Sequence, residues 1–250
     1  MKTVVCVKQV KVLGDEIEFT ENARDVDPDY IESVLNEWDA YATEEALLVR
    51  ERLGGEVVVL TCGDADAEKA LRRCLAMGAD RAIRIEGLAE HDPISVARAL
   101  AEVVSAEAPD LVLCGVQSSD SVQAAVPTGL AEVLGLPRVA VVTKLDCAGS
   151  GPATVHRELE GGLIDIVETS TPAVITIQTG INQPRYANLR AIKQAEHVEI
   201  DVRQAGDVGT PGYRVRRMFV PAKGEGAEML DGSPAEIAAR VVEIVQERLK

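Results

Sequence analysis

Short, mostly apolar runs alternate with helical patterns through the first 145 residues, and this alternation limits the fold more than any other feature. The apolar runs lie at 3–10, 56–62, 81–85, 110–115 and 138–145. Each is too short for a helix and apolar on both faces, as expected for strands of a parallel sheet that is covered on both sides. Helical patterns lie between them at 39–53, 64–77, 92–107 and 122–134. The alternation predicts a three-layer α/β sandwich with a mostly parallel sheet and right-handed crossovers.

After residue 150 the pattern changes. Two strand-like runs flank Gly161-Gly162, which predicts an added β-hairpin, and another apolar strand follows at 173–179. Pro184 interrupts regular structure, so the first half of 181–195 is expected to be a loop. Residues 196–232 are polar and rich in Gly and Pro, which favours an extended arm that is ordered only against something else.

The chain ends in a segment with strong helix signals. Ser233 is the expected N-cap, Pro234 the first helical position, and Glu236 completes a capping box. The apolar residues that follow recur with helical spacing and form a stripe. Docking of this helix on a neighbouring subunit and docking on its own domain both remain open from the sequence.

The charge of the chain excludes several classes of partner. There are 41 acidic and 26 basic residues, for a formal charge of −15. A nucleic-acid-binding surface needs a basic stripe, and an anionic lipid surface attracts basic clusters, so neither partner is expected. Apolar runs of membrane-spanning length and a signal-peptide pattern are missing, and we therefore expect a cytoplasmic protein.

The cysteines and histidines show no metal-ligating pattern. The five cysteines lack paired spacing, which argues against a zinc site or a disulfide framework. Three of them lie in or at the end of apolar runs, so we interpret them as small buried thiols of a reducing compartment. The three histidines, His91, His156 and His197, are isolated in the sequence. No metal site is expected.

One loop has the character of a ligand-binding segment. Gly115 ends a buried strand, and the polar residues 116–121 follow before a helix that is expected to start near Val122. In open α/β sheets, ligands bind beyond the carboxyl ends of the strands, and a helix N-terminus offers free N–H groups to a phosphate. An ordinary Ser/Asp helix cap is the alternative. The common phosphate-loop, dinucleotide and nucleophile-elbow motifs are absent from the sequence.

A second candidate segment precedes the first helix. Residues 36–39, with the sequence NEWD, follow a long acidic insertion at 11–35, and insertions of this length are often functional. Trp38 is the only tryptophan. It is either a core residue or an aromatic side chain beside a planar cofactor or a partner.

Several of these segments, in their order along the chain, resemble the beta subunits of electron transfer flavoproteins. The matching segments are VKQV, NEWDAYATEEAL, LRRCLAMGADRAI, PDLVLCGVQSSD, VHRELEGG, TPAVITI and INQPRYANLRAIKQA. They cover roughly residues 1–195. The resemblance implies a Rossmann-like sheet of the adenine nucleotide alpha hydrolase type. It also implies a nucleotide-binding domain at 1–195, followed at 196–250 by an arm and a helix that pack on a partner subunit.

The resemblance implies an electron carrier rather than an enzyme. Family members form an obligate heterodimer with an alpha subunit, which holds the redox-active FAD. Electrons arrive from dehydrogenases of the acyl-CoA type, as in fatty acid β-oxidation, and leave to a quinone oxidoreductase or another acceptor. The beta subunit binds a structural AMP. In electron-bifurcating members, a second FAD takes the place of AMP.

The resemblance also assigns the nucleotide pocket to particular residues of this chain. They are Cys6, Asn36, Glu37, Trp38, Asp39, Cys62, Gly115, Val116, Gln117, Ser118, Ser119, Asp120, Ser121, Val122, Gln123, Ala124, Ala125 and Val126. Trp38 matches a position that lies near the flavin of the alpha subunit. The loop 115–126 differs from the form found in FAD-binding, bifurcating members and is closer to the AMP type.

A docking loop for the dehydrogenase is implied at Pro184, Arg185, Tyr186 and Leu189, and Leu189 matches the leucine that inserts into the partner. Lys193 is followed by Gln, Ala and Glu where many members have lysines, so a basic docking patch is thinner here.

Two alternatives to this reading remain. One is a bifurcating beta subunit that carries its own FAD and oxidises NADH. The other is a stand-alone nucleotide-binding protein of the universal-stress type.

Overall fold

The computed structural model describes residues 1–14, 16–88, 92–149, 151–222, 224, 226–227 and 229–249. Within them, the chain divides into two compact units, Met1–Arg217 and Met218–Lys250. His91 lies outside the described residues. Among the helices that are described, none has both the length and the apolar character needed to cross a membrane.

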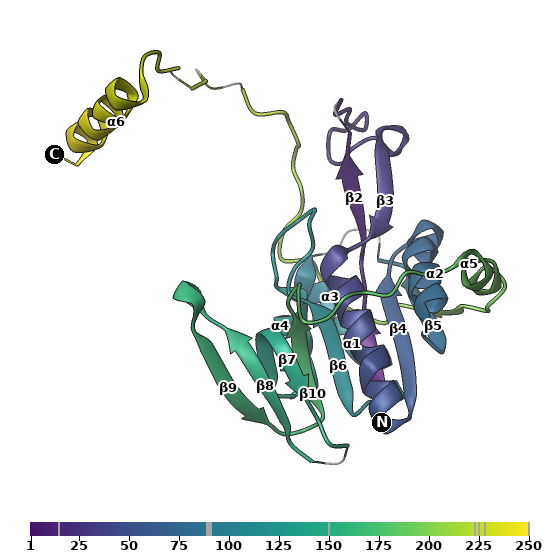
Figure 1. The fold of residues 1–250 in the computed structure, drawn as a ribbon. Helices are drawn as coiled ribbons and strands as arrows, with labels where there is room; N and C mark the ends of the chain where they lie inside the picture. Colours follow the sequence, from purple (N-terminus) through teal and green to yellow (C-terminus); the bar gives the residue numbers. More distant parts are fainter. Residues whose placement is uncertain are drawn as a thin grey trace. The chain divides into compact units, whose positions relative to one another are not determined.

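The first unit is built on a nine-stranded sheet within the described residues, in the order β11-β5-β4-β1-β6-β10-β7-β8-β9. The strands from β11 to β7 pair in parallel, and β8 and β9 are antiparallel additions. Their bounds are β1 Lys2–Cys6, β4 Glu56–Cys62, β5 Arg81–Glu86, β6 Leu111–Gly115, β7 Arg138–Asp146, β8 Ala153–Glu158, β9 Ile164–Thr169, β10 Ala173–Ile177 and β11 Asp201–Gln204. The predicted α/β class with a mostly parallel sheet is confirmed (Figure 1).

Helices cover both faces of the sheet, because its strands carry apolar side chains on both faces. The helices of this unit are α1 Glu37–Leu53, α2 Glu68–Met77, α3 Pro93–Glu107, α4 Val126–Leu134 and α5 Leu189–Ala195. Short 3₁₀ turns lie at η1 Pro28–Tyr30, η2 Ala65–Ala67 and η3 Glu160–Gly162. Val5 and Val59 pack with α1 and α2, whereas their neighbours Val4 and Val58 pack with α3 and α4. Successive side chains of a strand point to opposite faces, which produces two apolar cores.

The first predicted strand is divided in two. Residues 3–10 were expected to form one strand, but β1 ends at Cys6 and a separate strand, β2 Gln9–Leu13, begins three residues later. β2 pairs with β3 Ile31–Leu35 as an antiparallel ribbon of its own. The insertion at 11–35 therefore contains much of this ribbon, whose turn projects from the body of the unit (Figure 1).

The helix expected from residue 122 begins four residues later, at Val126. Val122 and Ala124 have φ angles of +52° and +50°, which a right-handed helix does not allow. The loop after β6 is therefore longer than predicted. The hairpin at Gly161-Gly162 is confirmed as β8 and β9.

The prediction for the arm, residues 196–232, is also partly wrong. Residues 196–232 were expected to be ordered only against something else, but Asp201–Gln204 forms β11 and extends the sheet beside β5. Arg203 of this strand forms an ion pair of 3.0 Å with Glu107 at the end of α3. Backbone pairing with β5 and this ion pair thus hold the first part of the arm on the first unit.

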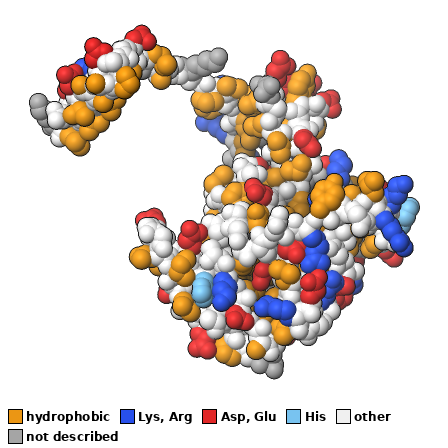
Figure 2. All heavy atoms as spheres, in the orientation of Figure 1, with side chains coloured by type: hydrophobic (Ala, Val, Ile, Leu, Met, Phe, Trp, Pro, Cys, Tyr) orange, Lys and Arg blue, Asp and Glu red, His pale blue; other side chains and the backbone are white. Residues whose placement is uncertain are grey.

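The second unit contains α6 Pro234–Arg248, and its predicted capping box of Ser233 and Glu236 is confirmed. Val241, Val245 and Leu249 are exposed, so that the described residues of this unit do not cover the apolar stripe (Figure 2). Packing of this segment on a partner subunit remains a prediction.

Candidate functional site

A cavity of about 330 Å³ opens at the carboxyl ends of β1, β4 and β6. This is the edge at which open α/β sheets bind ligands, and the volume lies at the lower end of the range for ligand pockets. The cavity collects residues from the end of β1, the start of α1, the loop after β6, the first half of α3 and the first turn of α4. Segments separated by more than a hundred residues in sequence meet here.

Most of the predicted nucleotide-binding residues line this cavity. Those that do are Cys6, Asn36, Asp39, Cys62, Gly115, Val116, Gln117, Ser118, Ser121, Gln123, Ala124, Ala125 and Val126. The remaining predicted residues, Glu37, Trp38, Ser119, Asp120 and Val122, are not among the lining residues.

The sequence reasoning missed other lining residues: Val7, Lys8, Asp92, Pro93, Val96, Leu100, Cys114, Pro127, Tyr213 and Val215. Asp92 and Pro93 carried a signal, because their helix cap places them at the same edge of the sheet as the predicted loop. Tyr213 and Val215 carried none, since they belong to an arm without periodicity.

Asn36 holds the loop after β6 against the first helix; we call this loop, residues 116–125, the ligand loop. Its side chain is buried, donates from Nδ2 to the carbonyl oxygen of Gln117 at 2.8 Å, and accepts at Oδ1 from the N–H of Ser119 at 3.3 Å. Its backbone N–H donates to the carbonyl oxygen of Lys8 at 3.0 Å. A side chain that both donates and accepts is needed at this junction, which explains the amide.

Asp39 joins the ends of two neighbouring strands. Its carboxylate accepts from the backbone N–H of Lys8 at 2.8 Å and from that of Gly115 at 2.9 Å. Burial raises the pKa of this carboxyl to about 7, although the two N–H groups favour the ionised form. A Cβ atom at Gly115 would lie 2.4 Å from Asp39 Oδ1, so only glycine permits this approach.

Lys8 places a positive charge beside the ligand loop. Its Nζ lies 2.6 Å from Asp120 Oδ1 and 3.3 Å from Ser118 Oγ, both of which it can donate to. Burial acts to raise the pKa of Asp120, but the hydrogen bonds from Lys8 and Ser118 leave it below its usual value. The first N–H groups of α4 have no partner within the helix, and Pro127 lies in that first turn. The mouth of the cavity therefore suits an anionic group.

Three thiols line the inner part of the cavity. Cys6 and Cys114 are register partners on adjacent strands, and Cys62 ends the strand on the other side. The hydrogen bond with Cys114 and burial raise the pKa of Cys6, and burial raises that of Cys62 to about 12. Cys6 and Cys62 thus stay protonated, and the three side chains form a small apolar floor rather than a nucleophile.

The predicted docking residues lie in a separate place, on the segment before α5 and at its start. Arg185 does not project outward, because its guanidinium pairs with Glu44 at 2.9 Å and with Glu51 at 2.8 Å on α1. Tyr186 and Leu189 are 84% and 79% exposed. Leu189 is the first residue of α5 rather than a residue of the predicted docking loop. Figure 2 shows basic side chains gathered over this helix.

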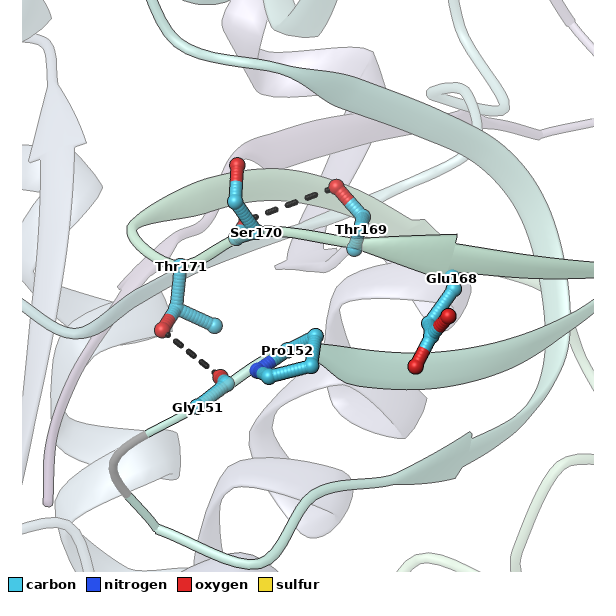
Figure 3. Close-up of a pocket in the computed structure, with 6 residues that line it drawn as sticks. All are labelled: Gly151, Pro152, Glu168, Thr169, Ser170 and Thr171. Carbon is cyan, nitrogen blue, oxygen red and sulfur yellow. Dashed lines mark hydrogen bonds between the residues drawn. The ribbon is translucent and has the colours of Figure 1, made fainter.

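A second hollow, of about 440 Å³, lies at the base of the β8–β9 hairpin (Figure 3). Two of its hydroxyl groups are engaged locally: Thr171 Oγ1 donates to the carbonyl oxygen of Gly151 at 3.0 Å, and Thr169 Oγ1 to that of Ser170. None of the predicted site residues lines it. Within the described ranges, no group of three His, Cys, Asp or Glu side chains could hold a metal ion.

Comparison with known proteins identifies the family. The model of the electron transfer flavoprotein domain matches residues 26–207, which is more than half of the chain. The chain is 44% identical to electron transfer flavoprotein subunit beta of Methylophilus methylotrophus, over 99% of this chain and 98% of the relative. The beta subunits of Bacillus subtilis and Syntrophomonas wolfei are 32% and 34% identical, over 90% and 100% of this chain and 90% and 98% of the relatives. The chain therefore belongs to the electron transfer flavoprotein family and is one of its beta subunits.

Proposed function

We propose that this chain pairs with an alpha subunit to form a heterodimeric electron carrier. Electrons from a dehydrogenase of the acyl-CoA type reach the FAD of the alpha subunit and pass to a quinone oxidoreductase or another acceptor. The residues of this chain bind a nucleotide and present a docking surface. They supply no acid, base or nucleophile to the transfer. We expect the complex to be cytoplasmic.

The proposed ligand of the cavity is AMP. The polar loop, Lys8 and the first turn of α4 suit a phosphate group, and the apolar wall of Val96 and Leu100 suits a base. The observation that carries the proposal is this combination of polar and apolar groups around one cavity, with Tyr213 and Val215 along one side. AMP is proposed rather than a second FAD because the sequence of the loop 115–126 is closer to the AMP type.

The docking residues support the proposed interaction with a dehydrogenase. Asn188 caps α5 through its side chain, which accepts from the N–H of Ala191 at 2.9 Å, and thereby fixes the exposed Leu189 at the start of the helix. The ion pairs of Arg185 hold the preceding segment on α1. A rigidly held, exposed leucine is a suitable anchor for a pocket on a partner.

Trp38 is proposed to lie beside the flavin of the alpha subunit. Its indole Nε1–H donates to Gln178 Oε1 at 3.1 Å, and Gln178 Nε2 donates to Glu158 Oε2 at 3.4 Å. These bonds fix the ring outside the nucleotide cavity. A separate role for Trp38 is consistent with its absence from the lining residues.

The nucleotide content of the heterodimer tests the proposal. The chain is co-purified with the product of a neighbouring alpha-subunit gene, the complex is denatured, and released nucleotides are quantified by chromatography. One FAD and one AMP per heterodimer are expected. Two FAD and no AMP would contradict the AMP assignment and establish the bifurcating alternative. A stable, colourless monomer with bound ATP would contradict the electron-carrier proposal.

A further inference from the structure

Part of the arm runs along one side of the nucleotide cavity. Residues 205–215, which we call the strap, follow β11 and contribute Tyr213 and Val215 to the cavity lining. Two hydrogen bonds attach the strap to α3 and its cap: Arg98 Nη1 donates to the carbonyl oxygen of Val208 at 2.8 Å, and the N–H of Gly212 donates to Asp92 Oδ2 at 2.6 Å. The strap is thus part of the same compact unit as the cavity.

The hydrogen bond to Asp92 holds Gly212 of the strap firmly on the cap of α3. The other oxygen of this carboxylate accepts from the N–H of Ser95 at 2.7 Å and caps α3. The hydrogen bonds from Ser95 and Gly212 lower the pKa of Asp92 below its usual value, so that it stays ionised. A charged acceptor strengthens both bonds. The strap is therefore anchored at Gly212 whenever α3 is folded.

The next residue of the strap makes a different kind of contact. The Tyr213 hydroxyl donates to Gln123 Oε1 at 2.8 Å, and both residues line the cavity. This bond connects the strap to the ligand loop after β6 rather than to α3. Both side chains are exposed, so that water competes for the bond.

The ligand loop beside Gln123 is strained. Val122 and Ala124 both have positive φ angles, and such angles are unfavourable for side chains with a Cβ, above all for the β-branched valine. The contact between Tyr213 and Gln123 depends on a solvent-exposed hydrogen bond to a strained loop. It therefore opens more readily than the attachment of Gly212 to Asp92.

We propose that the strap is a cover of the nucleotide cavity, with the Tyr213–Gln123 hydrogen bond as its latch. The inference rests on the proposed nucleotide function. The ligand enters and leaves when the latch opens and residues 213–215 of the strap swing away from the cavity, while residues 205–212 stay attached through Val208 and Gly212. Tyr213 thereby controls the rate of nucleotide exchange.

The matched variants are Tyr213→Phe, which removes only the latch hydroxyl, and Tyr30→Phe, which removes the same hydroxyl from an exposed tyrosine that does not line the cavity. Association and dissociation of radiolabelled AMP are followed by rapid filtration with the full chain. Tyr213→Phe is expected to raise both rates several-fold, with a smaller change in Kd. A rise in the dissociation rate alone would show that Tyr213 is only a wall contact, and unchanged rates would also overturn the latch.

Trypsin tests the latch without any ligand. Arg214 and Arg216 are exposed residues on and beside the strap, and cleavage in a folded protein requires local opening. Ligand-free Tyr213→Phe is expected to be cut faster at Arg214, with unchanged cleavage at Arg190 on α5. Equal cleavage of wild type and variant at Arg214 would refute the latch, whatever the cavity binds. Failure of AMP to bind wild type would instead refute the proposed ligand, so the two failures are distinguishable.

Discussion

The carboxylate of Asp39 accepts a hydrogen bond from the backbone N–H of Gly115, 76 residues away in the sequence, at a distance of 2.9 Å. The bond connects the first turn of α1 to the end of β6. The other oxygen of the Asp39 carboxylate accepts from the backbone N–H of Lys8, just after β1. One buried side chain therefore holds the ends of two neighbouring strands at the edge where the nucleotide is proposed to bind.

Gly115→Ala tests this close approach. The added methyl group would lie 2.4 Å from Asp39 Oδ1 and 2.6 Å from Trp38 Cβ, so α1 must shift. The free energy of unfolding is expected to fall by about 1–3 kcal/mol, the range for overpacking. Urea unfolding measures it. Gly14→Ala is the control, since its methyl group would meet only the carbonyl oxygen of Tyr30, at 3.9 Å. Equal losses in both variants would contradict the explanation.

Asp39 predicts a pH dependence of stability near neutrality. Its pKa is raised by burial to about 7 in the folded chain, whereas an unfolded aspartate has a pKa of about 4. Between these values the folded state holds a proton that the unfolded state lacks. The stabilising contribution is complete below about pH 4 and is lost as the pH rises to about 7.

Asp39→Asn removes this titration. The free energy of unfolding of the chain, measured by urea between pH 5 and 8, is expected to fall with pH more steeply in wild type than in the variant. The difference in slope approaches about 1.4 kcal/mol per pH unit. Burial also raises the pKa of Glu45, but that residue is common to both proteins and leaves the difference unaffected. Parallel curves would contradict a raised pKa at Asp39.

Glu107 predicts the opposite dependence in acid. Its carboxylate contacts Lys2, Arg81 and Arg203, and above all the hydrogen bond from Arg81 lowers its pKa to about 2. The contribution is present above about pH 4.5 and is lost as the pH falls towards 2. Glu107→Gln is expected to lower the free energy of unfolding by about 1–2 kcal/mol at pH 7. Urea unfolding at pH 4 and pH 3 is expected to show a smaller loss of this free energy of unfolding. The exposed Glu32→Gln is the control, and a constant loss at every pH would count against the prediction.

Leu189→Ala is expected to weaken docking of the dehydrogenase by roughly 10- to 100-fold, because a buried leucine contributes about 1.5–3 kcal/mol to an interface. Leu189 is 79% exposed in the free chain, so stability and AMP content should not change. Leu163→Ala removes a leucine that is 65% exposed on the hairpin and serves as the control. Calorimetric titration with the dehydrogenase gives both affinities. Equal affinities of the two variants would place the docking surface elsewhere.

Trp38→Phe tests the proposed neighbour of the flavin. The variant loses the indole donor to Gln178 and part of the ring area. The flavin absorbance spectrum of the heterodimer and its rate of electron transfer are expected to change, while AMP content stays constant, since Trp38 does not line the cavity. An unchanged spectrum together with an unchanged rate would remove the support for a flavin contact.

The sequence was sufficient for the layers of the fold. Runs such as 56–62 and 110–115 are apolar on both faces, and burial on both sides is the only arrangement that satisfies them. The same reasoning located the loop after Gly115, because strand ends and helix starts meet at one edge of a parallel sheet. The helix caps at Asp92 and Ser233 could also be predicted from the sequence, since a cap depends on neighbouring residues only.

Features that depend on distant contacts were decided by the tertiary structure. The sequence of residues 196–217 shows no periodicity, yet β11 forms because the edge of β5 offers unpaired N–H and C=O groups. The helix after the ligand loop starts at Val126 rather than Val122, in a loop whose backbone is bonded to Asn36 and whose Gln123 is bonded to Tyr213. Local propensity therefore determined most elements of this chain, but not β11 or the start of α4. The enclosure of its cavity was decided by hydrogen bonds between segments about 80 to 120 residues apart, whose partners no local pattern specifies.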